Sequence, residues 1–211
     1  MTNSPTALTV ATDITSLETD TDGRTLRRRR NRDAVIASLI SLIQEGDLDP
    51  TVANIADRAE VSHRSVFRYF DDLDDLARTA LETALRDALP LAVIAGVGTG
   101  SLDDRIEGVI AARLRILTHT KFLVRVAKAK SATLPEVDRM VANVAAMNRD
   151  QFRRHFEIEL AEMEPRDRAH VTALLSSQMG FEGYDHQSSV LQRTDEEIAD
   201  AWRLLMRRLL V

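Results

Sequence analysis

The chain has 211 residues, no Cys and a formal net charge of −5, with 44% apolar and 4% aromatic residues. The absence of Cys excludes a disulfide scaffold, a thiolate zinc site and a cysteine nucleophile. The length is sufficient for one or two domains with a hydrophobic core, and the scarcity of Gly and Pro beside abundant Ala, Leu and Arg favours an all-helical protein.

The acidic total hides an uneven distribution of charge along the chain. Residues 1–23 carry four acids and no base, residues 24–70 carry nine Arg against six acids, and residues 71–211 carry 19 bases and 23 acids. The three stretches therefore have net charges of −4, +3 and −4. The total alone disfavours a contact with nucleic acid, whereas a basic stretch inside an acidic chain is compatible with one. The densest part is the run Arg27–Arg30, which is either a solvated charge run or an arm that contacts phosphate.

Residues 1–23 are rich in Thr and acids, with seven Thr and only scattered apolar residues. They lack the basic and then apolar order of a secretory signal. No apolar run in the chain approaches the roughly 18 residues of a membrane span. We therefore expect residues 1–23 to form a disordered tail on a cytoplasmic protein that does not bind a membrane.

Three helices are predicted between the Arg run and residue 70. An apolar stripe over 33–45 predicts the first helix, which Gly46 ends. Thr51 is a suitable N-cap for a short helix up to Arg58, and Ser62 caps another that runs to about Tyr69. Helices of about seven residues are unstable alone, so the two short helices must pack on the first one.

The two short helices have the pattern of a helix-turn-helix unit. Small and apolar residues fall where the helices cross, where the turn is filled and where the unit faces its support helix: Ile55, Ala56, Ala59, Val61 and Val66. The second short helix then presents basic and hydrogen-bonding side chains on its outer face. Such side chains can reach base edges and phosphates in a major groove. A small bundle of three helices with a polar surface is the alternative interpretation.

The remainder of the chain is predicted to be helical as well. Four Asp residues at 71, 72, 74 and 75 begin a long helix that Pro90 and the Gly-rich segment 96–100 end. Ser101 or Asp103 begins the next helix, and a shorter one is expected over 121–130.

Pro135 begins a long helix that is predicted to reach about Glu162. Another helix begins at Pro165, after which Gly180 and Gly183 are expected to break the chain into a polar loop. Thr194 caps the last helix. The predicted fold class is therefore all-α with about nine helices.

The segment from Thr51 to Leu76 carries the most specific pattern in the chain. It reads TVANIADRAEVS, then HRSVFRYF, then a polar segment up to Leu76. This resembles the TetR family of bacterial transcriptional regulators, whose pattern is T-V-x-x-I-A-x-x-A-G-V-S followed by a recognition helix ending in Y-x-x-F. Beyond this segment the chain matches the family only in the number, order and length of its helices. The resemblance implies a DNA-binding domain over 24–72 and an effector-binding and dimerisation domain over 73–211.

Three positions depart from the family pattern. Glu60 stands where Gly is usual, which costs roughly 1 kcal/mol if the turn requires a left-handed backbone. Phe67 replaces a usual Tyr and lacks its hydroxyl, and Leu73 stands where a Lys is frequent. Two phosphate contacts are thereby missing, and the Arg run is a candidate to compensate for them.

The resemblance and the chemistry of the residues together assign the side chains expected to contact DNA. Thr51 and Ser62 place helix N-termini near phosphate. Base or groove contacts are expected from the second short helix, and a backbone contact from its last residue. The candidate set is Arg27, Arg28, Arg29, Arg30, Thr51, Ser62, His63, Arg64, Ser65, Phe67, Arg68 and Tyr69.

One short recognition helix reads few bases, so we expect two copies of the chain to pair about a two-fold axis. The resemblance implies a four-helix interface built from the last two helices of each copy. Burial of both apolar stripes within one subunit is the alternative. The candidate interface residues are Val171, Leu174, Leu175, Met179, Ile198, Trp202, Leu205 and Leu209.

The helices between these parts are of the kind that encloses a small apolar effector. Methionines at 140 and 147 would form an adaptable wall, and His119 is the best polar candidate. Ordinary core packing is the alternative for each position. The candidates are Leu114, Leu117, His119, Phe122, Val126, Met140, Val144, Met147 and Phe181. The five His residues show no metal-ligand spacing, so we expect no metal and no other cofactor.

These features predict a ligand-responsive repressor that binds a palindromic double-stranded operator as a homodimer. A ligand that prefers another spacing of the two recognition helices would lower the affinity for DNA. A helix-turn-helix activator, or a regulator without a small-molecule ligand, is the alternative. A small all-helical enzyme is disfavoured because the chain lacks the GxGxxG, P-loop, GxSxG and HExxH motifs.

Overall fold

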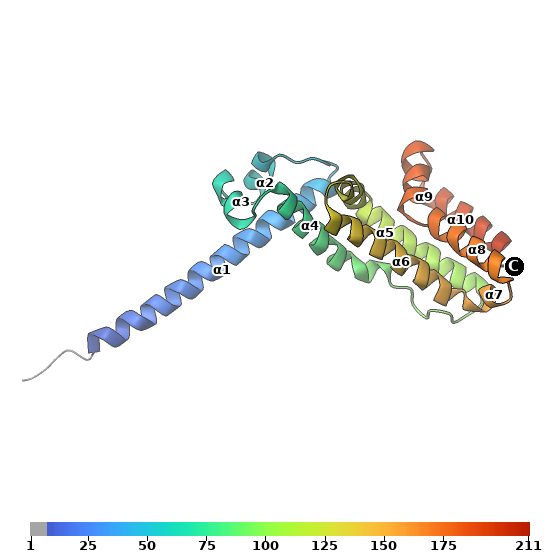
Figure 1. Cartoon of the computed structure of the whole chain (residues 1–211), viewed down its shortest axis with the longest axis horizontal. Coiled ribbons are helices and arrows are strands. Elements are labelled where there is room, and N and C mark those ends of the chain that lie inside the picture. Colours follow the sequence, from blue (N-terminus) through green and yellow to red (C-terminus); the bar gives the residue numbers. More distant parts are fainter. Residues whose placement is uncertain (1–7) are drawn as a thin grey trace, which may run out of the picture.

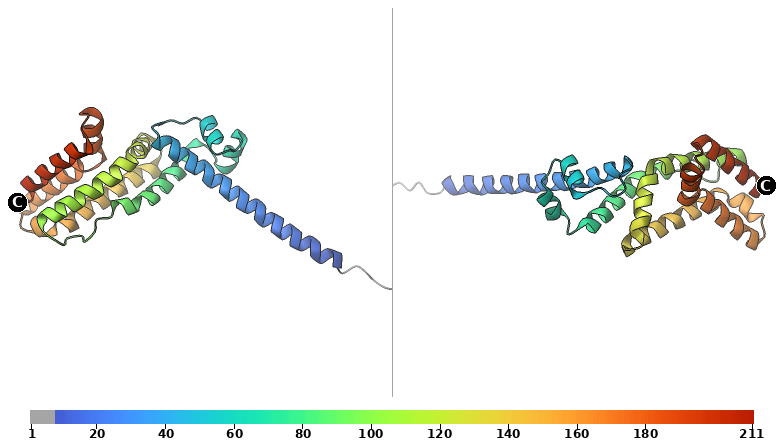
Figure 2. Two further views of the ribbon diagram at one scale, coloured as in Figure 1. Left: turned by 180° about the vertical axis from the view of Figure 1, so that it is seen from behind. Right: turned by 90° about the horizontal axis from the view of Figure 1, so that it is seen from above.

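The structure is a computed structural model that describes residues 8–211, with side chains described from residue 23 onward. In this part of the chain there are ten α-helices, one 3-10 turn and one π turn, and no strand. The predicted all-α fold class is therefore confirmed. Figures 1 and 2 show the first half of α1 projecting away from an elongated body of packed helices.

Helix α1 (Leu8–Gln44) is longer than the sequence predicts. Its packed part carries the predicted apolar stripe, with Val35, Leu39 and Ile43 buried. Helix α1 also includes residues 8–23 of the segment for which the sequence predicts a disordered tail, whereas residues 1–7 lie outside the described part; the tail itself stays a prediction. An apolar stripe marks only where a helix packs, whereas backbone hydrogen bonds can continue wherever no Pro removes a donor, and none stands between Pro5 and Pro50.

Helices α2 (Val52–Arg58) and α3 (His63–Tyr69) have the predicted bounds and caps. The Thr51 hydroxyl accepts a hydrogen bond from the Asn54 backbone N–H at 3.2 Å. The Ser62 hydroxyl accepts one from the Ser65 backbone N–H at the same distance. Each cap satisfies an N–H group that the first turn of a helix leaves without a partner.

Helix α4 (Leu73–Ala88) is capped by Asp72 and passes into the 3-10 turn η1 (Leu89–Ala92) at Pro90. After the Gly-rich loop, a capping box of Ser101 and Asp104 begins α5 (Leu102–Ser131). This helix is continuous, so the separate helix expected over 121–130 is wrong. Neither Gly nor Pro interrupts the chain there, and the Thr120 hydroxyl bonds back to the Ile116 carbonyl oxygen within the helix.

The helix that begins at Pro135 is shorter than expected. Helix α6 (Pro135–His155) ends at Phe156, whose backbone leaves the helical region, and α7 (Glu157–Ala161) follows. The side chain of Phe156 is fully buried in the C-terminal core at this break.

Helix α8 (Pro165–Gln178) is followed by α9 (Phe181–Asp185) and the π turn η2 (His186–Val190), not by the expected polar loop. A Cβ at Gly183 would lie 2.2 Å from the Gln178 carbonyl oxygen. This glycine therefore allows α9 to approach the end of α8 instead of breaking the chain. The last helix, α10 (Asp195–Leu209), has the predicted Thr194 cap.

The buried apolar residues form two clusters. The N-terminal core joins α1 to α4 with the last turns of α5 and the start of α6, around residues such as Val35, Ile55 and Leu76. The C-terminal core joins the first turns of α5 with α6 to α10, around residues such as Ile106 and Trp202. Helix α5 passes through both cores, so the two are mechanically linked by one continuous element.

Candidate nucleic-acid interface

The turn between α2 and α3 contains a left-handed backbone at Glu60, a conformation that residues other than glycine disfavour. Glu60 has φ +53°, in the left-handed region. The next residue, Val61, donates its backbone N–H to the Ala56 carbonyl oxygen at 3.0 Å and so closes the turn. Glycine would adopt this conformation without a steric penalty. The expected conflict at Glu60 is therefore present in the structure.

The two faces of α3 differ as the helix-turn-helix pattern predicts. Val66 is buried against the N-terminal core. On the opposite face His63, Arg64, Phe67 and Arg68 are exposed, and the ring of His63 lies edge-on to Phe67 at 6.0 Å between centroids. The unit thus holds an exposed basic surface on a rigid apolar base, which is the arrangement needed for groove contacts.

Ser65 and Tyr69 are less available on this surface than expected. Ser65 is half-buried, and its hydroxyl lies 2.9 Å from the Ser62 hydroxyl. Tyr69 is only 9% exposed, and its hydroxyl accepts a hydrogen bond from Arg68 Nη2 at 2.9 Å. The Tyr69 hydroxyl therefore already has a partner within the protein, whereas the sequence assigns this residue a contact with the DNA backbone. We interpret Tyr69 as a residue that positions the Arg68 guanidinium.

The pKa of Tyr69 is shifted by basic residues that lie close to it. Burial raises the pKa of Tyr69, but hydrogen bonds from Arg68 and Asn31 and the charges of Arg68 and Arg28 lower it, and the net shift is downward. The Arg32 guanidinium lies 4.9 Å from the centre of the Phe70 ring. The structure thus brings the basic stretch of α1 beside the end of α3 (Figure 1), and Arg27–Arg30 are all exposed there.

Arg58 is a basic residue of the helix-turn-helix unit with a structural contact. It donates to both carboxylate oxygens of Glu45, at 2.6 and 2.8 Å, and to the Ser41 hydroxyl at 3.0 Å. The hydrogen bond from Arg58 lowers the pKa of Glu45. This pair ties α2 to the last turn of α1. Its partners are too far apart in sequence for a helical spacing rule to identify them.

The candidate effector residues do not converge on one cavity. Leu114 and His119 line a surface hollow of about 680 Å³ that also includes Gln44 at the end of α1. Met140, Val144 and Met147 line a separate groove of about 480 Å³ between α4 and α6. The remaining candidates are buried or half-buried within the two cores: Leu117, Phe122, Val126 and Phe181. The expected single pocket therefore stays a prediction.

The candidate interface residues divide into two groups. Leu175, Met179, Ile198 and Trp202 are buried in the C-terminal core of one chain. Leu174 is 51% exposed, and Val171, Leu205 and Leu209 are half-buried. Leu204, which the apolar stripe omits, is 61% exposed. Only part of each stripe is therefore available for a partner.

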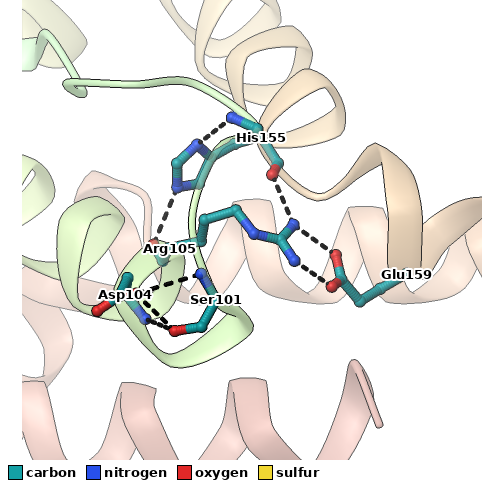
Figure 3. A network of polar contacts seen from close by, with 6 residues as sticks. Ser101, Asp104, Arg105, His155 and Glu159 are labelled. Atoms are coloured by element: carbon teal, nitrogen blue, oxygen red, sulfur yellow. Dashed lines mark hydrogen bonds and ion pairs between the residues drawn. The ribbon is translucent and has the colours of Figure 1, made fainter.

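A buried polar network lies in the C-terminal core and was not predicted (Figure 3). Arg105 donates to both carboxylate oxygens of Glu159 and to the His155 carbonyl oxygen. His155 Nδ1 accepts from the Gly98 backbone N–H at 3.2 Å, so Nε2 carries the proton and donates to the Arg105 carbonyl oxygen at 2.9 Å. The network holds the Gly-rich loop against α5 and α6.

In the part of the chain with described side chains, no group of three or more His, Asp or Glu residues could hold a metal ion. Among the described helices, none is both long and apolar enough to cross a membrane.

Solved structures with the same fold include transcriptional regulators. One, from Rhodococcus sp. RHA1, superposes with a TM-score of 0.62 at 18% sequence identity, covering 87% of this chain and 95% of its own. Another, from Pseudomonas aeruginosa PAO1 and described as a transcriptional regulator, has a TM-score of 0.61 at 15% identity, with coverages of 89% and 91%. No protein-family model matches the chain, and no curated protein matches its sequence. The chain therefore shares the fold of these two proteins over most of its length.

Proposed function

We propose that the chain is a DNA-binding transcriptional regulator of the TetR type, and that α3 enters the major groove of a palindromic operator. The observation that carries this proposal is the exposed basic face of α3 on a helix-turn-helix base. Beside it lies the basic stretch of α1, in which Arg32 contacts Phe70 and Arg27–Arg30 are exposed. Arg64 and Arg68 are placed to reach base edges, and the Arg run to neutralise phosphates. The fold shared with two transcriptional regulators supports the same function.

The regulator acts as a homodimer in this proposal, with α8 and α10 forming the interface. These two helices pack side by side at one end of the molecule (Figure 1). Leu174 on α8 and Leu204 on α10 expose apolar surface there, and half-buried Val171 and Leu205 extend it. Two copies of this surface would bury the exposed leucines and set the spacing of two recognition helices.

Repression is released by a small molecule bound in the C-terminal region. Helix α5 passes from the C-terminal core into the N-terminal core. Near its end Lys130 pairs with Asp74 at the start of α4, at 2.7 Å, and α4 packs on α1. A ligand that prefers a different position of α5 would therefore shift the recognition helix and lower operator affinity by its differential binding.

DNA binding is tested with the full chain and a fluorescent duplex from the region upstream of its own coding sequence, titrated by anisotropy at several salt concentrations. Arg68→Ala and Arg64→Ala are each expected to weaken binding about tenfold, because each removes a groove contact worth roughly 1–3 kcal/mol. Replacing Arg27–Arg30 with Ala should weaken binding and reduce its salt dependence.

Arg166→Ala is the matched control, since this Arg is exposed on α8 far from α3. Unchanged affinity in the α3 variants, or equal losses in the control, would refute the proposed interface. Sedimentation of Leu174→Glu and Leu204→Glu tests the dimer, which should dissociate while the monomers stay folded.

A further inference from the structure

Two arginines on α5 are buried to the same degree but are neutralised differently. Arg105 is 4% exposed and Arg113 is 5% exposed. Arg105 pairs with Glu159. Arg113 has no carboxylate partner among the residues whose side chains are described, and its contacts are with an amide. The same helix therefore carries one compensated and one uncompensated cation.

Buried apolar side chains lie one helical turn from Arg113 on α5 and from its partner Asn148 on α6. Arg113 Nη1 donates to Asn148 Oδ1, and Nη2 donates to the Asn148 carbonyl oxygen at 3.2 Å. Val109 and Leu117, one turn away on either side of Arg113, are buried, as is Phe152 one turn beyond Asn148. Burial lowers the pKa of Arg113 to about 10, and no charged group among the residues with described side chains offsets this effect.

A buried guanidinium without a counter-charge is strongly unfavourable, because water no longer solvates it and an amide oxygen supplies only a partial charge. The two bonds to Asn148 leave further N–H groups of the guanidinium for another acceptor. A negatively charged group is the partner that would satisfy both the charge and these donors, and Arg binds carboxylates through two parallel hydrogen bonds.

Two buried donor atoms of the C-terminal core, Arg105 Nε and Trp202 Nε1, have no hydrogen-bond partner among the described residues. Trp202 Nε1 on α10 is fully buried and makes no hydrogen bond. Helix α10 lies along α5, since Arg203 and Arg207 pair with Glu107 and Asp103 of α5. The C-terminal core thus holds buried donor groups on neighbouring helices that an acceptor-rich or anionic ligand would satisfy.

We propose that the C-terminal core binds a small molecule with an apolar body and one carboxylate group, and that Arg113 and Asn148 hold the carboxylate between α5 and α6. The apolar body then packs against the side chains that flank these two residues, Leu117 and Phe152 among them. The role of this molecule as the effector of the regulator rests on the proposed function, whereas its binding to Arg113 does not. His119, the polar candidate from the sequence, lies in the separate surface hollow and takes no part in this site.

The test uses decanoate and its neutral analogue decanamide as probes, with the full chain at constant ionic strength. Binding is followed by calorimetry and by the fluorescence of Trp202, the single Trp of the chain. Decanoate is expected to bind the natural sequence at least tenfold more tightly than decanamide. Arg113→Met should remove this preference. Arg149→Met, which changes an exposed Arg next to Asn148, should retain it.

Asn148→Asp provides an independent variant, because it places an internal carboxylate beside Arg113. It is expected to fold, to melt at a higher temperature and to lose the preference for decanoate by at least tenfold. The proposal is overturned if the natural sequence does not prefer decanoate, or if either Arg113→Met or Asn148→Asp keeps the preference. Failure of Arg113→Met to fold would leave the decision to Asn148→Asp.

DNA anisotropy on the same samples separates this inference from the proposed function. Without probe, Arg149→Met, which lies outside the proposed site, should bind DNA as the natural sequence does. A chain that binds decanoate through Arg113 but does not bind DNA would refute the regulator and keep the carboxylate site. A chain that binds DNA without any preference for decanoate would refute the carboxylate site and keep the regulator.

Discussion

The two cores of this protein differ in how many polar and charged side chains they bury. The N-terminal core buries almost only apolar side chains and leaves its basic residues on the outer face of α3 and on α1. The C-terminal core buries two arginines and a histidine among its apolar residues. An apolar core needs only volume and pattern to fold, whereas buried charges need specific partners. The difference predicts that stability of the C-terminal core depends on single polar contacts and pH, and that of the N-terminal core on packing.

The largest effect is expected from Glu159→Gln in the C-terminal core. The substitution leaves the buried Arg105 guanidinium without a full counter-charge, and breaking a buried pair in this way costs about 3–5 kcal/mol of the free energy of unfolding. Urea denaturation measures the loss. Glu157→Gln, an exposed neighbour on α7, is the control and should change little. A loss of unfolding free energy below about 1 kcal/mol is the value for a solvent-exposed ion pair, and it would contradict the burial of the Arg105–Glu159 pair.

The stability of the N-terminal core should depend on the volume of its buried side chains and not on their charge. Ala56 is buried where α2 meets its neighbours, so Ala56→Leu is expected to cost about 1–3 kcal/mol through overpacking. DNA affinity should fall with it, because α3 is displaced. The exposed Ala53→Leu on the same helix is the control. Equal unfolding free energies for the two variants would contradict the close packing of the helix-turn-helix unit.

Acid should weaken the C-terminal core through His155. Burial lowers the pKa of His155, a hydrogen bond to the Arg105 carbonyl oxygen raises it, and the net shift is downward. The unfolded chain therefore binds a proton that the folded chain does not, and stability declines as pH falls below about 6.5, by at most about 1.4 kcal/mol per pH unit. Protonation of Nδ1 would also lose the bond from Gly98.

Unfolding measured between pH 7.5 and 5 checks this expectation. His155→Gln should be less stable at pH 7.5 and should show a smaller decline with pH. His170→Gln, exposed on α8, should show the natural profile. A natural profile that is flat across this range would contradict a buried, neutral His155.

The smallest effect is expected at the turn of the helix-turn-helix unit. Glu60 has a left-handed backbone, so Glu60→Gly should raise the free energy of unfolding by up to about 1 kcal/mol. The gain is partly offset by the greater freedom of Gly in the unfolded chain. Asp57→Gly, at an exposed position inside α2, should instead destabilise. A lower melting temperature for Glu60→Gly would show that the Glu60 side chain makes a stabilising contact.

The sequence predicted the parts of the fold that depend on near neighbours. The caps at Thr51, Ser62 and Thr194 are present at the predicted positions, because each joins residues three apart. It did not predict that α5 is continuous, that Phe156 interrupts α6, or that α9 packs closely on α8 at Gly183. These outcomes depend on contacts between helices that no local pattern encodes.

The candidate sites likewise divide into features that follow from local patterns and features that depend on contacts between distant helices. The exposed basic face of α3 follows from helical periodicity, whereas the burial of Tyr69 and its bond to Arg68 depend on how α3 meets α1. Arg105 and Glu159 lie 54 residues apart, and Arg113 reaches Asn148 across 35. No local pattern in the sequence marks these pairs of residues as partners.

The sequence by itself therefore determined the all-α class, the helix-turn-helix unit and the location of positive charge, because these follow from spacings of three and four residues and from local composition. Only the tertiary structure decided which arginines are buried and which of them has a counter-charge. The physical reason is that burial is a property of packed helices: a side chain loses its water only when elements from distant parts of the chain surround it, and the cost of its charge arises at that point.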